Sequence, residues 1–237
     1  MKKKLYNHLN DYYKSIFNER VLKIPLDAGF TCPNRDGTKG YGGCIFCSNR
    51  GAGDRLKQIS VKEQVNNFFA SFKAQKANKF IVYFQNYTNT YKSVEELKEI
   101  YDSALIDERI VGLDIATRCD CLNEEIVDLL GKYTEKYFVQ VELGLQTSNE
   151  KTHKNINQLI TNDEFIKAVN LLNKYKIHIV VHIMVGLPGE THDDIVKTIS
   201  FLRDIKYHGI KIHSTFIEKD TMLYELYKFD KYRKIIS

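Results

Sequence analysis

Three cysteines, Cys32, Cys44 and Cys47, lie within sixteen residues, in a loop with five glycines between Gly29 and Gly43. Eleven residues separate the first two cysteines and two separate the last two. Three thiolates on a cubane of four irons leave one iron open as a substrate site, whereas structural zinc sites are closed by four ligands. The spacing therefore predicts an open iron–sulfur site. Two alternatives stay open: a zinc site completed in space by other cysteines, and three small buried thiols.

Composition places the chain among ordinary globular proteins. Its 237 residues are 43% hydrophobic and 27% charged, which excludes disordered and collagen-like classes. The sequence contains no run of about 18 apolar residues, and the basic N-terminus leads into polar sequence where a signal peptide needs an apolar stretch. We therefore expect a cytoplasmic protein without a membrane partner, with reduced cysteines. The net charge of +5 is scattered, so it is weak support for RNA binding.

Short β-branched runs alternate with amphipathic helical patterns along the chain. The predicted strands are Val21–Asp27, Phe80–Phe84, Val111–Thr117, Phe138–Leu143, His178–Met184 and Gly209–His213. The predicted helices are Val61–Lys76, Val94–Ile106, Glu124–Tyr137, Asp163–Tyr175 and Ile195–Ile205. Ser60 with Glu63, and Ser93 with Glu96, are typical of capping boxes at two of the helix starts.

Repeated strand–helix units predict an α/β fold with parallel strands, either an open doubly wound sheet or a barrel. Six units favour an incomplete, TIM-like barrel. In both architectures the working face lies at the carboxyl ends of the strands, and the cysteine loop directly follows the first strand. We expect one domain over residues 21–237, preceded by an N-terminal extension over residues 1–20.

Four segments carry a resemblance to a known family. They are Leu26–Thr38 around the first cysteine, Tyr83–Tyr91, Val141–Thr147 and Gly186–Glu190. Together they resemble an uncharacterised bacterial radical SAM family of the YhcC type, whose relatives include the Elongator catalytic subunit and oxygen-independent coproporphyrinogen oxidase. The similarity extends from about Leu5 to His213. The family continues into further helical sequence, so this chain is expected to lack a C-terminal extension.

The resemblance implies a partial (β/α)6 barrel with a 4Fe-4S cluster on the three cysteines and S-adenosyl-L-methionine on the open iron. It implies an enzyme that forms a 5′-deoxyadenosyl radical, which abstracts hydrogen from a substrate that the sequence does not identify. The expected electron donor is a flavodoxin or ferredoxin. It further implies cofactor contacts after the second to fifth strands, from Gln85, Asn86, Thr117, Glu142, Gln146, His182, Gly186, Leu187 and Pro188.

Some of these contacts have a plainer alternative. Gln146 can be a satisfied buried amide, His182 a packed core histidine, and residues 186–189 an ordinary strand-to-helix turn. The chain also departs from the family, because Gln158 stands where relatives often have Arg and Cys119 where they have Pro. Cys119 and Cys121 are expected to be tolerated small residues.

Two other functions compete with the radical enzyme. One is a metal-stabilised RNA-binding or tRNA-modification-associated protein, and RNA is also a possible substrate of the enzyme. The other is a truncated, inactive remnant, suggested by the short C-terminus and the substituted positions. The intact cysteine triplet argues against complete loss of function.

Overall fold

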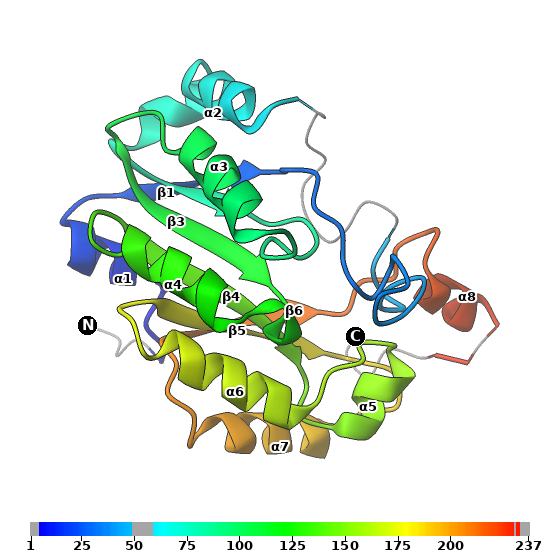
Figure 1. Cartoon of the computed structure of the whole chain (residues 1–237). Helices are drawn as coiled ribbons and strands as arrows, with labels where there is room; N and C mark the ends of the chain where they lie inside the picture. Colours follow the sequence, from blue (N-terminus) through cyan, green and yellow to red (C-terminus); the bar gives the residue numbers. More distant parts are fainter. Residues whose placement is uncertain (1–4, 49–58, 230, 233–237) are drawn as a thin grey trace.

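The computed structural model describes residues 5–48, 59–229, 231 and 232. Six parallel strands form one curled sheet in chain order. They are β1 (Val21–Leu26), β2 (Lys79–Phe84), β3 (Ile110–Thr117), β4 (Phe138–Gln146), β5 (His178–Val185) and β6 (Gly209–Ser214). Since β1 and β6 are the two edges, the sheet is an open half-barrel (Figure 1). The predicted partial barrel is confirmed.

Helices cover the outer face of the half-barrel (Figure 1). They are α2 (Val61–Phe69), α3 (Val94–Ala104), α4 (Glu124–Tyr133), α6 (Asn162–Leu172) and α7 (His192–Leu202), with short 3₁₀ turns at Phe72–Lys76 and Cys119–Cys121. Three further helices were not predicted: α1 (Leu9–Phe17), α5 (Glu150–Asn155) and α8 (Met222–Lys228). None of the described helices combines the length and apolar character that a bilayer crossing requires.

Local hydrogen bonds explain where the helices begin and end. Both predicted capping boxes are present, because Ser60 and Ser93 each exchange hydrogen bonds with the glutamate three residues on. The helix predicted to run from Val61 to Lys76 breaks after Phe69, where the Ser71 hydroxyl donates to the carbonyl of Phe68 at 2.6 Å. A serine that bonds to the preceding turn competes with continuation of the helix. The predicted single helix was wrong at this point.

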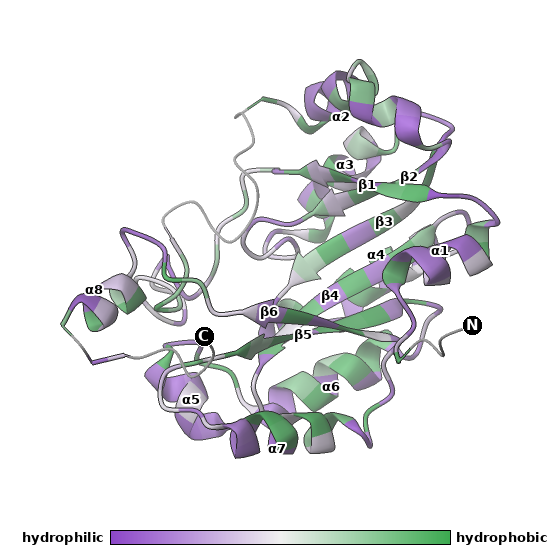
Figure 2. Cartoon of the chain, turned by 180° about the vertical axis from the view of Figure 1, so that it is seen from behind, coloured by the Kyte–Doolittle hydropathy of each residue, from purple (hydrophilic) through white to green (hydrophobic). Residues whose placement is uncertain are grey.

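Alternation along the strands separates two environments. Residues on the outer face, such as Phe80, Phe84 and Leu143, are fully buried against the helices. Phe80 lies 5.0 Å from Phe69 of α2, and Phe84 lies 5.4 Å from Tyr101 of α3, measured between ring centroids. Figure 2 shows hydrophobic residues along the strands, with hydrophilic segments that interrupt β3 and β4. Those hydrophilic residues face the inside of the half-barrel.

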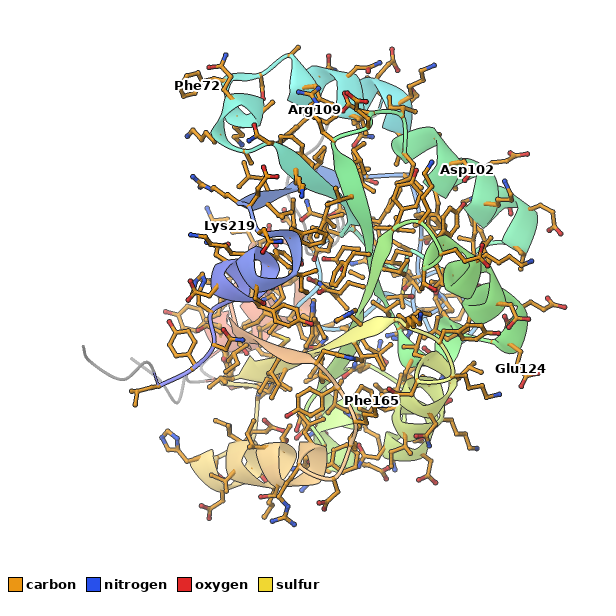
Figure 3. All side chains as sticks on the ribbon, turned by 90° about the vertical axis from the view of Figure 1, so that its left-hand side faces the viewer. Phe72, Asp102, Arg109, Glu124, Phe165 and Lys219 are labelled. Carbon is orange, nitrogen blue, oxygen red and sulfur yellow. The ribbon has the colours of Figure 1, made fainter. Side chains whose placement is uncertain are left out.

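Helix α1 covers the amino ends of the strands, opposite the cysteine loop (Figure 1). Its Tyr13 is buried in a small cluster with Val21 and Ile81, against which Phe138 packs. The Tyr13 hydroxyl donates to Gln140 of β4 at 3.4 Å. In contrast to the buried Tyr13, the Glu124 side chain projects from the outer surface (Figure 3). Helix α1 of the expected extension therefore packs on the half-barrel.

Candidate functional site

The three cysteines of the loop after β1 face one pocket at the carboxyl ends of the strands. Cys32, Cys44 and Cys47 are half-buried free thiols, and all three line this pocket. Its volume is about 350 Å³, within the range of small-molecule sites. We call it the strand-end pocket. Its position is the one expected for a ligand site on a parallel α/β sheet.

Buried polar contacts hold the cysteine loop in shape. The fully buried Asn34 amide donates to the carbonyl of Asn157 and lies 3.8 Å from the sulfur of Cys44. Arg35 donates to the carbonyl of Cys47 at 3.0 Å and to that of Ser48. Both contacts tie the first half of the loop to the second, so the spacing of the sulfurs is fixed by protein groups.

Distant segments support the same loop from outside. The amide of Ile45 donates to the carbonyl of Ile156 at 3.0 Å, and the amide of Leu223 at the start of α8 donates to the carbonyl of Ile45 at 2.9 Å. Asn157 adds bonds from its amide to the carbonyls of Tyr41 and Gly43. Neither α8 nor this use of Asn157 was visible in the sequence.

Positive charge surrounds the thiols. A hydrogen bond from the Cys44 thiol lowers the pKa of Cys47, opposed by burial and helped by the charges of Arg35 and Arg118. The same bond, together with burial, raises the pKa of Cys44, while the charge of Arg118 counteracts it. Two guanidinium groups are thus placed to stabilise negative charge on these sulfurs.

The three thiols can be compared with what an iron–sulfur cluster needs. Among the described residues, no three His, Cys, Asp or Glu side chains converge as ligands of one metal ion. A cubane cluster binds each thiolate through a different iron, so its ligands do not need to meet at one point. Three thiols, two nearby guanidiniums and an open pocket therefore fit an anionic cluster with one accessible iron.

The structure brings together five of the nine predicted cofactor residues. The strand-end pocket is lined by Gln85, Thr117, Glu142, Gln146 and His182, which come from β3, β4, β5 and the segment after β2. These five side chains therefore share a pocket with the cysteines, and their contact with a cofactor stays a prediction.

The other four predicted residues are not among those that line the pocket. The buried Asn86 donates to Asp27 at 2.6 Å. The Leu187 side chain is fully buried, and Gly186, at φ +86°, turns the chain after β5 beside Pro188. Any contact of these residues with a ligand stays a prediction.

Two glutamines offer unused polar atoms in the strand-end pocket. Gln85 Nε2 and Gln158 Oε1 are buried and have no hydrogen-bond partner among the described residues. Buried polar atoms without a partner are unfavourable, so each indicates a place where a ligand can bond. Gln158 is held from its other end, since its Nε2 donates to the carbonyl of Gly144 at 3.2 Å.

Gln146 has an unusual backbone. Its φ is +68°, in the left-handed region that non-glycine residues seldom occupy, and the pairing of β4 with β5 shifts register just before it. A Cβ on Gly144 would lie 3.1 Å from the side-chain nitrogen Nε2 of Gln146, so a larger residue at position 144 would crowd that side chain. Strained backbone of this kind is most common at functional sites. The sequence identified the residue but not its conformation.

Glu142 is the centre of a buried charged network on the floor of the pocket. Its carboxylate accepts hydrogen bonds from Lys23 at 2.6 Å, Tyr83 at 2.7 Å, and His182 and Lys211 at 2.8 Å each. Burial alone would raise the pKa of Glu142, but the His182 bond and the two ammonium charges hold it well below its usual range. Three of these donors bond to Oε2 and Lys23 bonds to Oε1, so Glu142 holds its four neighbours in place.

Sequence reasoning missed most of this network. Lys23, Tyr83, Asp114 and Lys211 come from β1, β2, β3 and β6, and Lys23 also forms an ion pair with Asp114. Burial, with the nearby charge of Glu142, raises the pKa of Asp114 to about 7. Parallel strands covered on both faces are normally apolar, so a polar residue near the middle of successive strands was the available signal.

The remaining cysteines have different environments. Cys119 belongs to the apolar core, and burial raises the pKa of its thiol to about 12. Burial also raises the pKa of Cys121, which lines a second, shallower pocket beside Lys39. Between them, Asp120 accepts two bonds from Arg118 at 2.8 Å each. That both are tolerated small residues stays a prediction.

Comparison with known proteins gives consistent matches. The model of the radical SAM superfamily matches residues 32–202. The chain is 39% identical over 233 residues to the uncharacterized protein YtqA of Bacillus subtilis, covering 96% of this chain and 72% of the relative. It is 35% identical over 209 residues to protein YhcC of Escherichia coli, covering 87% and 67%.

Solved structures agree at the level of the fold. Elp3 of Methanocaldococcus infernus superposes with a TM-score of 0.65 at 17% identity, covering 90% of this chain and 50% of that one. Coproporphyrinogen III oxidase, HemN, of Escherichia coli gives 0.56 at 11% identity, covering 90% and 48%. This chain therefore spans half or less of either solved chain.

Proposed function

Because the chain belongs to the radical SAM superfamily, we propose that Cys32, Cys44 and Cys47 hold a 4Fe-4S cluster that reductively cleaves S-adenosyl-L-methionine. The observation that carries the proposal is the shared pocket: all three thiols face the same cavity as Gln85, Gln146 and other strand-end side chains. When bound, the cluster and its cosubstrate supply a 5′-deoxyadenosyl radical that abstracts hydrogen from the substrate.

In this proposal the side chains of the pocket bind and orient the ligand. Gln85 Nε2 and Gln158 Oε1, which have no partner among the described residues, supply one donor and one acceptor toward a polar ligand. Gln146 and Thr117 line the same wall from neighbouring strands. The half-buried Phe46 and Met184 add apolar surface, which limits the water around a reactive species.

Anaerobic reconstitution with iron and sulfide tests this function. The wild-type chain is expected to bind about four irons, show the absorbance and spin resonance of a 4Fe-4S cluster, and release 5′-deoxyadenosine under reduction. Cys32→Ala should lose the cluster spectra and the release of 5′-deoxyadenosine, and should bind less iron. Cys121→Ala is the matched control, because this thiol lies in the neighbouring pocket and is not an expected ligand.

Several outcomes would reject the proposal. A Cys32→Ala protein that assembles the same cluster and cleaves the cosubstrate would exclude the assigned ligands. Zinc in place of iron, lost in Cys121→Ala, would support the closed structural site. A normal cluster without 5′-deoxyadenosine release would support the inactive remnant.

We further propose a flavodoxin or ferredoxin as electron donor and keep RNA as a candidate substrate class. RNA binding is expected to weaken steeply with salt, and a shallow salt dependence would argue against it. For domain organisation, we propose that residues 21–237 form the catalytic domain and that residues 1–20 extend it. Deleting the first 20 residues should leave a folded domain but cost stability, because Tyr13 packs onto the sheet.

A further inference from the structure

One end of the strand-end pocket lies on β6, the open edge of the half-barrel. Lys211 and His213 of this strand both line the pocket, while Ile212 between them is 65% exposed on the other face. This alternation is that of a regular strand, so the two polar side chains lie side by side along the cavity wall. The cysteine loop forms a different part of the wall.

Lys211 has a hydrogen-bond donor to spare. Its ammonium group lies 2.8 Å from Glu142 Oε2 and 3.0 Å from the Tyr83 hydroxyl, and its side chain is 36% exposed. An ammonium carries three N–H donors, so one is left after these two contacts. The two contacts also fix the direction in which that donor points.

His213 also has a polar atom without a hydrogen-bond partner among the described residues. This atom is the buried Nε2. The ring lies 5.0 Å from that of His182, between centroids. Burial first, then the nearby His182 and Lys211, lower the pKa of His213 to about 4, against the opposing charge of Glu142. The ring is therefore neutral at pH 7 and has one N–H to donate.

We propose that Lys211 and His213 form a subsite for an anionic oxygen group, a carboxylate or phosphate, of the substrate. The inference rests on the proposed function of this pocket. A cation is disfavoured because the ammonium groups of Lys23 and Lys211 already pair with the Glu142 carboxylate. The other acidic residue that lines the pocket, Glu218, is exposed to solvent.

The probes are sodium phosphate and sodium acetate, against sodium chloride at the same ionic strength. Histidine ring signals are followed by NMR at pH 7, in metal-free and in reconstituted protein. Phosphate or acetate is expected to shift the His213 signals saturably. His178 is the internal control, because its pKa is also lowered to about 4 by burial but it lies at the amino end of β5. A shift of both histidines alike would overturn the proposal.

Substitutions sharpen the test. Lys211→Met should weaken anion binding about tenfold or more, since a charge-assisted bond is lost. Lys211→Arg keeps the charge and should retain most binding, which also covers the case that the Met variant does not fold. Lys197→Met on α7 is the control, because this lysine is exposed and outside the pocket. Equal affinity in the wild-type and Lys211→Met proteins would refute the subsite.

Adding S-adenosyl-L-methionine shows whether the anionic group at this subsite belongs to the substrate or to the cosubstrate. If the subsite serves the substrate, phosphate still shifts His213 when the cosubstrate is saturating. Displacement of phosphate by the cosubstrate would assign the subsite to the cosubstrate carboxylate and overturn the proposal. Because anion binding is also measured in metal-free protein, a failure to assemble a cluster would reject the proposed function without deciding this result.

Discussion

Replacing Glu142 by glutamine removes one negative charge and keeps the shape of the side chain. Glutamine has one acceptor oxygen, and its amide nitrogen would face at least one of the four present donors. The least costly orientation turns that nitrogen toward Lys23, which keeps Asp114 as a partner, and leaves the oxygen for Lys211, His182 and Tyr83. The charge of Lys211 then has no carboxylate among its hydrogen-bond partners.

The expected cost follows from the burial of the network. Breaking a buried ion pair typically costs 3–5 kcal/mol, and we expect about 3 kcal/mol here because the Lys23 and Lys211 side chains are partly exposed. For a chain of this length that corresponds to a drop in Tm of roughly 6–12 °C. Metal-free Glu142→Gln and wild-type proteins should be compared by urea and thermal unfolding at pH 7.

Glu124→Gln is the matched control. Glu124 lies on the outer surface of α4, where it forms an exposed ion pair with Lys174 at 3.2 Å (Figure 3). An exposed pair contributes less than about 1 kcal/mol. The reasoning is refuted if Glu142→Gln loses no more stability than Glu124→Gln.

The pH dependence of the Glu142→Gln effect has a definite sign. The pKa of Glu142 is held well below its usual range, despite the opposing effect of burial, by His182, Lys23 and Lys211. The carboxylate therefore contributes its full stability above the unfolded pKa, near 4.5, and loses it as the pH falls further. The difference between wild type and variant should shrink below about pH 4.5. A constant difference down to pH 3 would contradict this assignment.

Three further predictions use other parts of the chain. Gly43→Ala should destabilise the protein by about 1–2 kcal/mol more than Gly42→Ala in urea unfolding, and it should also lower cluster loading. Both glycines have a positive φ, but only at Gly43 would a Cβ lie 2.8 Å from the Arg35 side chain. Ser93→Ala should cost about 1 kcal/mol through the lost cap of α3, and an unchanged urea midpoint would contradict it. His178 and His213 should each make stability fall between about pH 6.5 and 4, because burial lowers both native pKa values to about 4 while the unfolded chain binds the protons. His178→Gln should remove the His178 share of this slope in urea unfolding.

The strands were predictable because their signal is local. Runs such as Phe80–Phe84 and Phe138–Leu143 contain β-branched and aromatic residues at alternate positions or throughout, and each lies in a strand of the structure. The starts of α2 and α3 were predictable for the same reason, since a capping box needs only four residues. Helix α5 was missed because its six residues are too few to show an apolar period.

Site residues that belong to a sequence motif were predictable. Site residues that meet only because the sheet is curved were not. The cysteine loop and Gln146 belong to segments with recognisable residues. Lys23 and Lys211 are single lysines in edge strands, and a lysine in an edge strand ordinarily faces water. Only when the sheet curls do both reach the same carboxylate on β4.

The hydrogen bonds that support the cysteine loop constrain the order of assembly during synthesis. Ile45 is bound by Ile156 and by Leu223, and both partners leave the ribosome long after the three cysteines do. Until those segments arrive, the thiols are carried on a loop without its native supports. For the cluster proposed above, loading in the native geometry is therefore expected late, after the chain has been made through α8.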